Sequence, residues 1–326
     1  MRAVVYDEFG GPLAVRDVPA PSVPVDGVLV RVEATGVCRS DWHGWQGHDA
    51  DITTLPHVPG HELAGTVAAV GEQVAQWSVG DRVTVPFVNA CGACAQCAEG
   101  NGQVCALQRQ PGFTHWGSFA ELVALHAADV NLVAVPDDLS MVTAAALGCR
   151  FATSYRALAS VACVQPGERV LVFGAGGVGL SAVQVAVALG ATVAVEDPHP
   201  AAVELALAMG AVTSVSDPHV TVDAIGDPRV VERALALLRP RGRHLQIGLL
   251  PGEQPRVPMA RVLARELQVL GSHGMAAHEY PAMLSLVASG ALRPELLVSR
   301  TVGLEEAGQA LVDVGRTAGI TVVEIS

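Results

Sequence analysis

The feature of this chain that most constrains its fold is a glycine-rich turn between an apolar strand and an apolar helix. Residues 169–173 read Arg-Val-Leu-Val-Phe, residues 174–179 read Gly-Ala-Gly-Gly-Val-Gly, and a helical stretch follows toward Gly190. Glycines at the first, third and sixth positions of the motif permit a tight turn, a close approach of a ligand to the backbone, and close packing of the helix on the strand. The unpaired N–H groups at the start of such a helix attract phosphate. The pattern is typical of a dinucleotide-binding turn, although a plain glycine-rich turn would look similar.

An acidic residue at the end of the next strand supports a dinucleotide ligand. Asp197 follows the glycines by about twenty residues, the position from which a carboxylate accepts both ribose hydroxyls. Its neighbour Glu196 is an alternative ribose partner, and an acid that only meets solvent is a second alternative. A carboxylate repels a 2′-phosphate, and residues 197–202 contain neither Arg nor Lys. The sequence therefore predicts NAD and disfavours NADP.

The chain changes texture near its middle, which indicates two domains. With 326 residues it exceeds one typical core. Short alternating runs bounded by turn residues, such as 28–33 and 81–86, predict an irregular, mostly antiparallel β domain over 1–150 and 272–326. Ala/Leu-rich helices that alternate with Val-rich strands predict a doubly wound parallel α/β domain of the Rossmann type over 151–271.

One connection in the α/β domain is too short for a complete sheet. Only residues 216–219 separate the expected strands at 212–215 and 220–224. In the usual strand order these two strands lie about 14 Å apart sideways, and a parallel crossover normally takes a dozen or more residues. Four extended residues span at most about 14 Å, before the return along the strand is counted. We therefore expect a missing crossover helix and a reduced sheet edge near residues 211–220.

The composition restricts the partners of the chain. A formal net charge of −12 and a pI near 5.3 argue against nucleic acid and against an anionic membrane surface. The N-terminus carries Asp7 and Glu8 where a secretory signal would be basic and apolar, and no apolar run is long enough to span a bilayer. We expect a soluble, cytoplasmic protein. Clustered cysteines in a reducing compartment are more often metal ligands or catalytic groups than disulfides.

Four of the seven cysteines form one such cluster. Cys91, Cys94, Cys97 and Cys105 have the spacing C-x2-C-x2-C-x7-C in a loop rich in Gly and Ala. Four nearby thiolates can close a tetrahedral shell around a structural zinc ion. An iron–sulfur cluster is the competing interpretation, but its bacterial motif has a shorter last gap followed by Pro, whereas Ala106 stands here. Zinc is favoured.

The other three cysteines, with one histidine, suggest a second metal site. Cys38, Cys149 and Cys163 lie outside the cluster, and His61 stands in a Pro-Gly-His-Glu motif. Two thiolates and one imidazole leave a fourth position on zinc open, as a Lewis-acid catalyst requires. Each of these residues can also be an ordinary buried side chain.

These motifs together resemble the zinc-containing medium-chain alcohol dehydrogenases. The matching stretches are residues 36–43, residues 60–62, the four-cysteine cluster, Cys149 and residues 174–179. They occur in the order of the family and cover nearly the whole chain. Cys163 matches no ligand position.

The resemblance implies a ligand set and a group behind it. Cys38, His61 and Cys149 would bind the catalytic zinc ion. Asp41 would orient His61 through the second ring nitrogen. Glu62 would lie just behind the metal and tune it or exchange with a ligand. A chain of this kind would hold two zinc ions.

The resemblance also implies a proton relay and cofactor contacts. Ser40 would take the substrate proton, and His43 would be the outer end of a relay that reaches solvent through the cofactor ribose. Arg39 would contact the pyrophosphate, and Thr153 and Val178 would press the nicotinamide toward the metal. The cofactor-binding residues expected in all are Gly174, Gly176, Gly177, Val178, Gly179, Asp197, Arg39 and Thr153.

The implied function is reversible hydride transfer between NAD and an alcohol, aldehyde or ketone. Phe87 matches a pocket-wall position, and the tryptophans Trp42, Trp45 and Trp116 either add apolar surface or pack the domain edge, so we expect a moderately bulky apolar substrate. A homodimer or homotetramer is expected from the resemblance. A zinc-free enone or quinone reductase and a non-catalytic dinucleotide-binding protein are the alternatives. The remaining histidines are expected at the surface or in polar networks, including His48, His57, His115 and His126.

Overall fold

The computed structural model describes residues 1–250, 252 and 254–325 and contains two compact units. The first unit comprises Met1–Cys149, Gly274–Ala282 and Val298–Ser326. The second comprises Arg150–His273 and Met283–Leu297. The last of these segments associates with the second unit, and within it the Arg293 N–H donates to the side-chain oxygen of Gln184 at 3.0 Å. The domain boundaries expected from the sequence stay a prediction.

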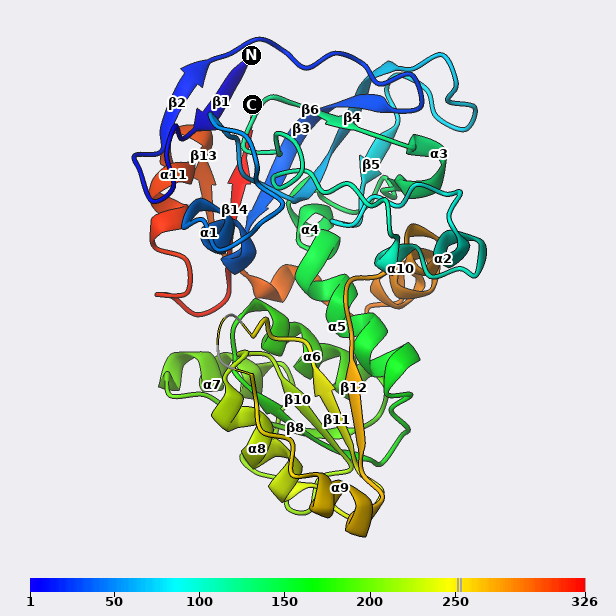
Figure 1. Ribbon diagram of the computed structural model, residues 1–326, viewed down its shortest axis with the longest axis vertical. Coiled ribbons are helices and arrows are strands. Elements are labelled where there is room, and N and C mark those ends of the chain that lie inside the picture. The colour runs from blue at the N-terminus through cyan, green and yellow to red at the C-terminus, as the bar shows by residue number, and fades with distance from the viewer. Residues whose placement is uncertain (251, 253, 326) are drawn as a thin grey trace. The chain divides into compact units, whose positions relative to one another are not determined.

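The first unit is built on a seven-stranded sheet and a separate two-stranded sheet (Figure 1). The larger sheet has the order β13-β14-β3-β4-β5-β7, with β6 paired to β3, and is antiparallel except between β13 and β14. Its strands are β3 (Val28–Val37), β4 (Glu62–Val70), β5 (Arg82–Thr84), β6 (Leu122–Leu125), β7 (Val133–Ala134), β13 (Val298–Gly303) and β14 (Ile320–Glu324). β1 (Arg2–Val5) pairs with β2 (Ala14–Asp17). The irregular, mostly antiparallel β domain expected from the sequence is confirmed.

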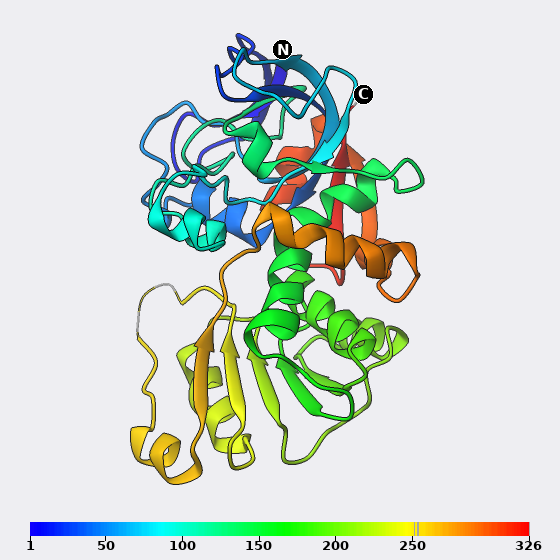
Figure 2. The same cartoon turned by 90° about the vertical axis from the view of Figure 1, so that its right-hand side faces the viewer.

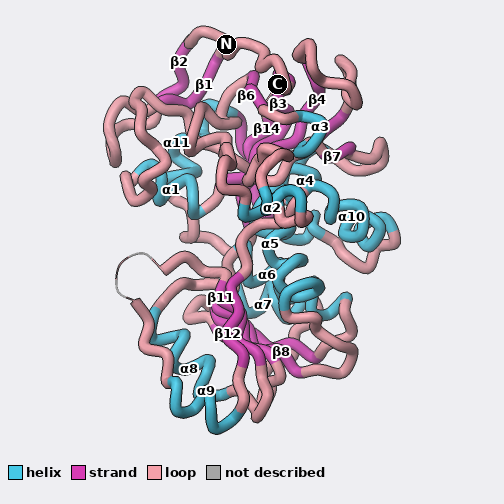
Figure 3. Tube along the Cα trace, turned by 45° about the vertical axis from the view of Figure 1, so that its right-hand side comes forward, coloured by secondary structure: helices cyan, strands magenta, loops and turns pink. Residues whose placement is uncertain are grey.

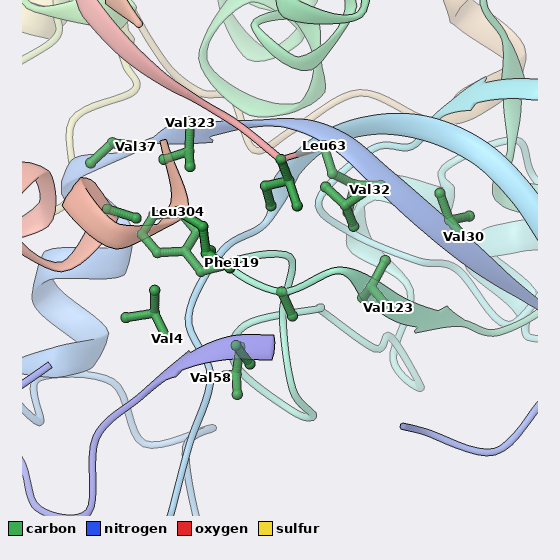
Figure 4. Close-up of a cluster of buried hydrophobic side chains, with 14 of the residues drawn as sticks. Val4, Val30, Val32, Val37, Val58, Leu63, Phe119, Val123, Leu304 and Val323 are labelled. Atoms are coloured by element: carbon green, nitrogen blue, oxygen red, sulfur yellow. The ribbon is translucent and has the colours of Figure 1, made fainter. Parts of the chain in front are cut away.

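The long strand β3 organises this unit. One of its edges pairs with β4, and the other pairs with β6 over Val28–Arg31 and with β14 over Ala34–Val37. With neighbours on both sides, most of its side chains are buried, and Arg31 is the exposed exception. Figure 4 shows part of the core that results, which combines side chains of β1, β3, β4 and β14 with Phe119. Burial of such side chains stabilises the unit by roughly 1.5–3 kcal/mol each.

Short helices complete the first unit, and two π-helical turns follow one another along the chain. The α-helices of this unit are α1 (Arg39–Trp45), α2 (Ala95–Ala98), α3 (Ala128–Asn131), α4 (Met141–Ala145) and α11 (Leu304–Val312), and its 3-10 turns are Gly102–Val104 and Ala277–Glu279. The first π-helical turn, Leu147–Phe151, contains the boundary between the units, whereas the second, Ala157–Val161, and the 3-10 turn Pro294–Leu297 belong to the second unit. Helix α10 (Tyr280–Ala288) contributes residues to both units. π-Helical turns are frequent at functional sites, and the first of these carries Cys149.

The second unit is a doubly wound parallel sheet, which confirms the predicted fold class. Its five strands have the order β12-β11-β10-β8-β9 and all pair in parallel (Figure 2). They are β8 (Arg169–Phe173), β9 (Thr192–Glu196), β10 (Val220–Asp223), β11 (Arg243–Gln246) and β12 (Gln268–Gly271), and the helices are α5 (Ala152–Arg156), α6 (Gly177–Ala188), α7 (Pro200–Ala208), α8 (Pro228–Leu237) and α9 (Met259–Arg265). The chain runs from β8 to β9 on one side and later adds β10, β11 and β12 on the other side of β8. Because the connections are right-handed, α6 and α7 lie on one face of the sheet and α8 and α9 on the other (Figure 3).

The edge of this sheet beside β9 is reduced, as the short connection predicts. Where a third strand would lie, Val212 makes a single parallel bridge with Ala194. The chain then turns back toward the sheet. The Arg169 guanidinium stabilises this turn by donating hydrogen bonds to the carbonyls of Ser216 and Asp217 at 2.8 Å each. The next strand, β10, pairs directly with β8. Four residues are too few for a full edge strand and a helical crossover.

None of the helices in the described ranges combines the length and the apolar character needed to cross a membrane.

Candidate functional site

The pairing of β3 with β4 brings the first two predicted metal ligands together. Gly36 near the end of β3 lies opposite Glu62 at the start of β4. Cys38, which follows β3, and His61, which precedes β4, therefore lie at the same end of this strand pair. Gly60 has a φ of +109°, and a Cβ there would lie 2.7 Å from the Phe119 nitrogen. Only glycine fits this turn, and the turn aims His61 at the end of β3.

Four potential ligands meet at this point. Cys38, His61, Glu62 and Cys149 each place one ligand atom within 4.8 Å of the others. Cys38 is 3% exposed, His61 and Glu62 are fully buried, and Cys149 is partly buried. Two sulfurs, one imidazole nitrogen and a carboxylate oxygen are ligands that zinc accepts. The structure thus brings together the three predicted ligands and the acid predicted to lie behind them.

One carboxylate fixes the geometry of this cluster. Asp41 lies buried in the first turn of α1, and its Oδ1 is 2.7 Å from Nδ1 of His61 and 3.0 Å from the Gly60 nitrogen. Its Oδ2 accepts a hydrogen bond from the Cys38 backbone N–H at 3.2 Å. With Nδ1 of His61 held by Asp41, Nε2 faces the cluster, buried and without a hydrogen-bond partner among the described residues. A buried nitrogen of this kind fits a metal ion.

Electrostatics at His61 also favour a cation. Burial opposes a charged ring, but the Asp41 carboxylate and the Cys38 sulfur outweigh it and raise the pKa of His61 well above its usual value. A metal ion and a proton therefore compete for Nε2. Because the neutral imidazole is the ligand form, metal binding here displaces a proton.

Tyr280 contacts this site although no sequence motif marks it. Its buried hydroxyl lies 3.3 Å from the Gly148 carbonyl and 3.4 Å from the Leu147 carbonyl, so it braces the π-helical turn that presents Cys149. Burial, with the charges of Cys149 and Glu62, raises the pKa of Tyr280 well above its usual value. The hydroxyl stays protonated and donates.

Helix α1 presents the residues predicted for the proton relay. Ser40 in its first turn and His43 one turn later are both half-buried. Nδ1 of His43 lies 3.1 Å from Nδ1 of His48, a residue expected only at the surface or in a polar network. The guanidinium carbon of Arg39 lies 4.0 Å from the centre of the Trp42 ring.

The four-cysteine cluster is compact in the same unit. Sγ of Cys94 lies 3.5 Å from Sγ of Cys97 and 3.7 Å from Sγ of Cys105, and Cys91 lies 4.0 Å from Cys97. Four sulfurs bound tetrahedrally to zinc lie about 3.8 Å apart, given Zn–S bonds of about 2.3 Å. The backbone N–H groups of Cys97 and Ala106 lower the pKa of Cys94 to about 6, which favours a thiolate. The cluster fits a structural zinc ion.

The glycine-rich turn of the second unit leaves space beside the backbone. Gly174 follows β8 with a φ of +94°, and a Cβ on Gly179 would lie 1.8 Å from the Gly174 carbonyl oxygen. A Cβ on Gly176, the residue before α6, would meet no atom within 4 Å. Gly174 and Gly179 are therefore required by the fold, whereas space at Gly176 is open for a ligand. Gly177 and Val178 form the first turn of α6.

The acid predicted to bind ribose is tied to this turn. Oδ2 of Asp197 accepts a hydrogen bond from the Ala175 N–H at 2.7 Å, so its carboxylate lies beside the glycines. Glu196, the alternative, pairs instead with Arg233 at 2.8 Å. Thr153 is buried on α5, where its neighbour Ser154 donates to the Val178 carbonyl at 2.9 Å. The structure thus gathers the cofactor-binding residues predicted for the second unit, while Arg39 lies on α1 of the first.

Comparisons with known proteins agree with both units. Residues 25–137 match the family described as alcohol dehydrogenase GroES-like domain, and residues 177–289 match zinc-binding dehydrogenase. An alcohol dehydrogenase of Rhizobium meliloti is 36% identical over 83% of this chain and 84% of its own length. One from Geobacillus stearothermophilus is 40% identical, and the match spans 60% of this chain and 58% of the relative.

A solved structure extends the likeness to the whole chain. Alcohol dehydrogenase TADH from Thermus sp. ATN1 superposes with a TM-score of 0.91, at 33% identity, and each chain covers 100% of the other. The sequence motifs, both sheets and the ligand cluster support the same family assignment. The chain belongs to the zinc-dependent medium-chain alcohol dehydrogenase family.

Proposed function

We propose that this protein is an NAD-dependent alcohol dehydrogenase with one catalytic and one structural zinc ion. The observation that carries the proposal is the buried cluster of Cys38, His61 and Cys149, in which Asp41 holds one nitrogen of His61 and leaves the other without a partner among the described residues. When bound there, zinc supplies a Lewis acid for the substrate oxygen, and NAD supplies the hydride acceptor.

The side chains around the cluster divide the remaining work. Ser40 accepts the proton of the alcohol and His43 takes it onward, since both lie on α1, the helix that directly follows Cys38. Asp41 keeps the ring of His61 in the tautomer that leaves Nε2 for the metal. The fully buried Glu62 lies within the ligand cluster and would be a further oxygen ligand for the metal ion when no substrate is bound.

The substrate class follows from the aromatic side chains beside His61. The ring of Phe113 lies 5.2 Å and that of Phe87 6.1 Å from the ring of His61, centre to centre. Trp45 is instead buried with its N–H bonded to the Gly11 carbonyl, and Trp116 donates to the Pro56 carbonyl. A wall of two phenylalanines favours an apolar alcohol, aldehyde or ketone of moderate bulk.

The experiment that tests the proposal is zinc analysis combined with an activity panel. We expect two zinc ions per chain and NAD reduction with graded primary and secondary alcohols. Cys149→Ser should retain one zinc ion and lose turnover. Cys163→Ser is the matched control, because its thiol is exposed and donates to the Ser160 carbonyl outside both clusters.

Three results would contradict the proposal. A chain without zinc that reduces enones or quinones would be a zinc-free reductase. A chain that binds NAD and zinc but oxidises or reduces no member of the panel would be a non-catalytic binding protein. Full turnover by Cys149→Ser with two zinc ions retained would show that Cys149 is no ligand.

A further inference from the structure

We propose that His48 is a positioning residue of the proton relay, which holds the outer nitrogen of His43 and passes the proton from His43 to solvent. The inference rests on the proposed alcohol dehydrogenase activity and extends it by one residue. It starts from the 3.1 Å contact between Nδ1 of His43 and Nδ1 of His48.

The end of α1 brings the two rings together through its backbone. The Gly47 N–H donates to the Gly44 carbonyl at 3.0 Å, and the His48 N–H donates to the His43 carbonyl at 2.9 Å. This pair of bonds, with Gly47 at a φ of +75°, is a Schellman motif. In that motif the residue two beyond the cap usually makes an apolar contact with the last turn. Here the contact joins two imidazoles.

Packing holds this pair in place. The ring of Trp42 meets the ring of His43 edge to face with centres 5.1 Å apart, and meets that of His48 at 5.9 Å. A Cβ on Gly47 would lie 2.9 Å from Cγ of Phe9, which keeps the turn tight. His43 is half-buried, whereas His48 is exposed. The pair therefore leads from the half-buried relay to water.

The hydrogen bond gives each nitrogen a defined task. When Nδ1–H of His43 donates to Nδ1 of His48, the lone pair on Nε2 of His43 is left to accept the substrate proton. As Nε2 gains that proton, the Nδ1–H bond of His43 breaks and an Nδ1–H bond forms on His48. His48 then loses its Nε2 proton to water, and both rings regain their starting tautomers by exchange with water.

Burial and nearby charges favour release of the proton from His43. Burial, followed by the charges of Arg39 and His48, lowers the pKa of His43, against the opposite effects of Cys38 and Asp49. His43 therefore does not keep a proton at neutral pH. Arg39 lies over Trp42, and Asp49 directly follows His48 in the chain.

Two variants separate the hydrogen bond from the proton transfer. His48→Phe keeps an aromatic ring against Trp42 but removes both nitrogens. His48→Asn can accept the Nδ1–H of His43 but cannot carry a proton. We expect both variants to lower kcat for alcohol oxidation about tenfold at neutral pH with KM unchanged, a modest share of a general acid–base contribution. Added imidazole buffer should restore kcat, which it would not do for a purely structural defect.

A second measurement does not depend on turnover. Nitrogen-15 shifts of His43 in zinc-loaded enzyme without NAD should show the Nδ1–H tautomer in wild type and in His48→Asn, and the Nε2–H tautomer in His48→Phe. Wild-type kcat, pH profile and His43 tautomer in His48→Phe would overturn the inference. His43→Gln distinguishes failure of the relay from failure of the proposed function. If this variant and the wild type oxidise alcohols equally well, the relay is wrong. If the wild type oxidises no alcohol, the proposed function fails.

Discussion

Asp41 is the single residue on which most of the metal cluster depends. One carboxylate meets the ring of His61 at 2.7 Å, the N–H of Gly60 at 3.0 Å and that of Cys38 at 3.2 Å. Asp41→Asn keeps the size but turns one acceptor into a donor and removes the charge that supports His61. We expect zinc affinity at the catalytic site to fall about 10–100-fold.

The measurement for Asp41→Asn is the zinc content after dialysis against graded chelator. One ion, held by the four-cysteine cluster, should remain at chelator concentrations that leave two in wild type. Asp49→Asn is the matched control, because the Oδ1 of Asp49 accepts the nearby Asp51 N–H at 2.9 Å and Asp49 belongs to neither ligand cluster. Equal retention of both ions in Asp41→Asn would contradict the role given to this carboxylate.

Motifs and the family resemblance identified the candidate ligands and Asp41, which orients His61, but they did not identify every group that positions the site. Cys38, His61 and Cys149 stand in motifs with chemical character of their own. Tyr280 has no such motif, and it meets the Gly148 carbonyl across 132 positions of sequence. His48 depends on the conformation at the end of α1, which a sequence pattern does not reveal. Long-range packing and turn geometry decide such positions.

The glycine-rich turn offers a matched pair of substitutions. A Cβ on Gly179 would lie 1.8 Å from the Gly174 carbonyl, so Gly179→Ala forces α6 away from β8 and should cost about 2–4 kcal/mol of unfolding free energy. A Cβ on Gly176 meets nothing within 4 Å, so Gly176→Ala should unfold like wild type and lose NAD affinity. Thermal unfolding and NADH fluorescence titration measure the two effects. Undiminished NAD binding by Gly176→Ala would count against pyrophosphate at this turn.

Helices and strands with a clear local hydrophobic pattern could be predicted from the sequence. Strand pairings that depend on segments far away in the sequence could not. Apolar runs bounded by turn residues predict the strands β8 and β9 and the helix α6. The shortened edge followed from counting residues 216–219, because chain length limits any connection. By contrast, nothing in residues 28–37 indicates that β6 and β14 share one edge of β3. That pairing depends on segments roughly ninety and three hundred residues away.

At the scale of the whole molecule, several histidines are held in a neutral form by their surroundings. His57, His115 and His126 all border a pocket of about 450 Å³ in the first unit, which the metal cluster does not line. Burial is the largest cause of the lowered pKa in each of them. His115 is affected most: burial, with the charges of His126 and Arg109, brings its pKa to about 4. Its Nε2 lies 3.1 Å from the Ala124 carbonyl, a bond that the neutral ring can make.

This shift predicts how stability depends on pH. In the unfolded chain His115 has a pKa near 6.5, so between about pH 6.5 and 4 the unfolded state binds more protons than the folded state. The stabilising contribution is complete above pH 6.5 and is lost as the pH falls toward 4, by about 3 kcal/mol for this residue. His115→Gln should therefore flatten the decline of unfolding free energy across this window, measured by urea denaturation at a series of pH values. His278→Gln, at an exposed position, controls for the loss of one imidazole. A decline as steep in His115→Gln as in wild type would mean that His115 takes up its proton in the folded protein without cost.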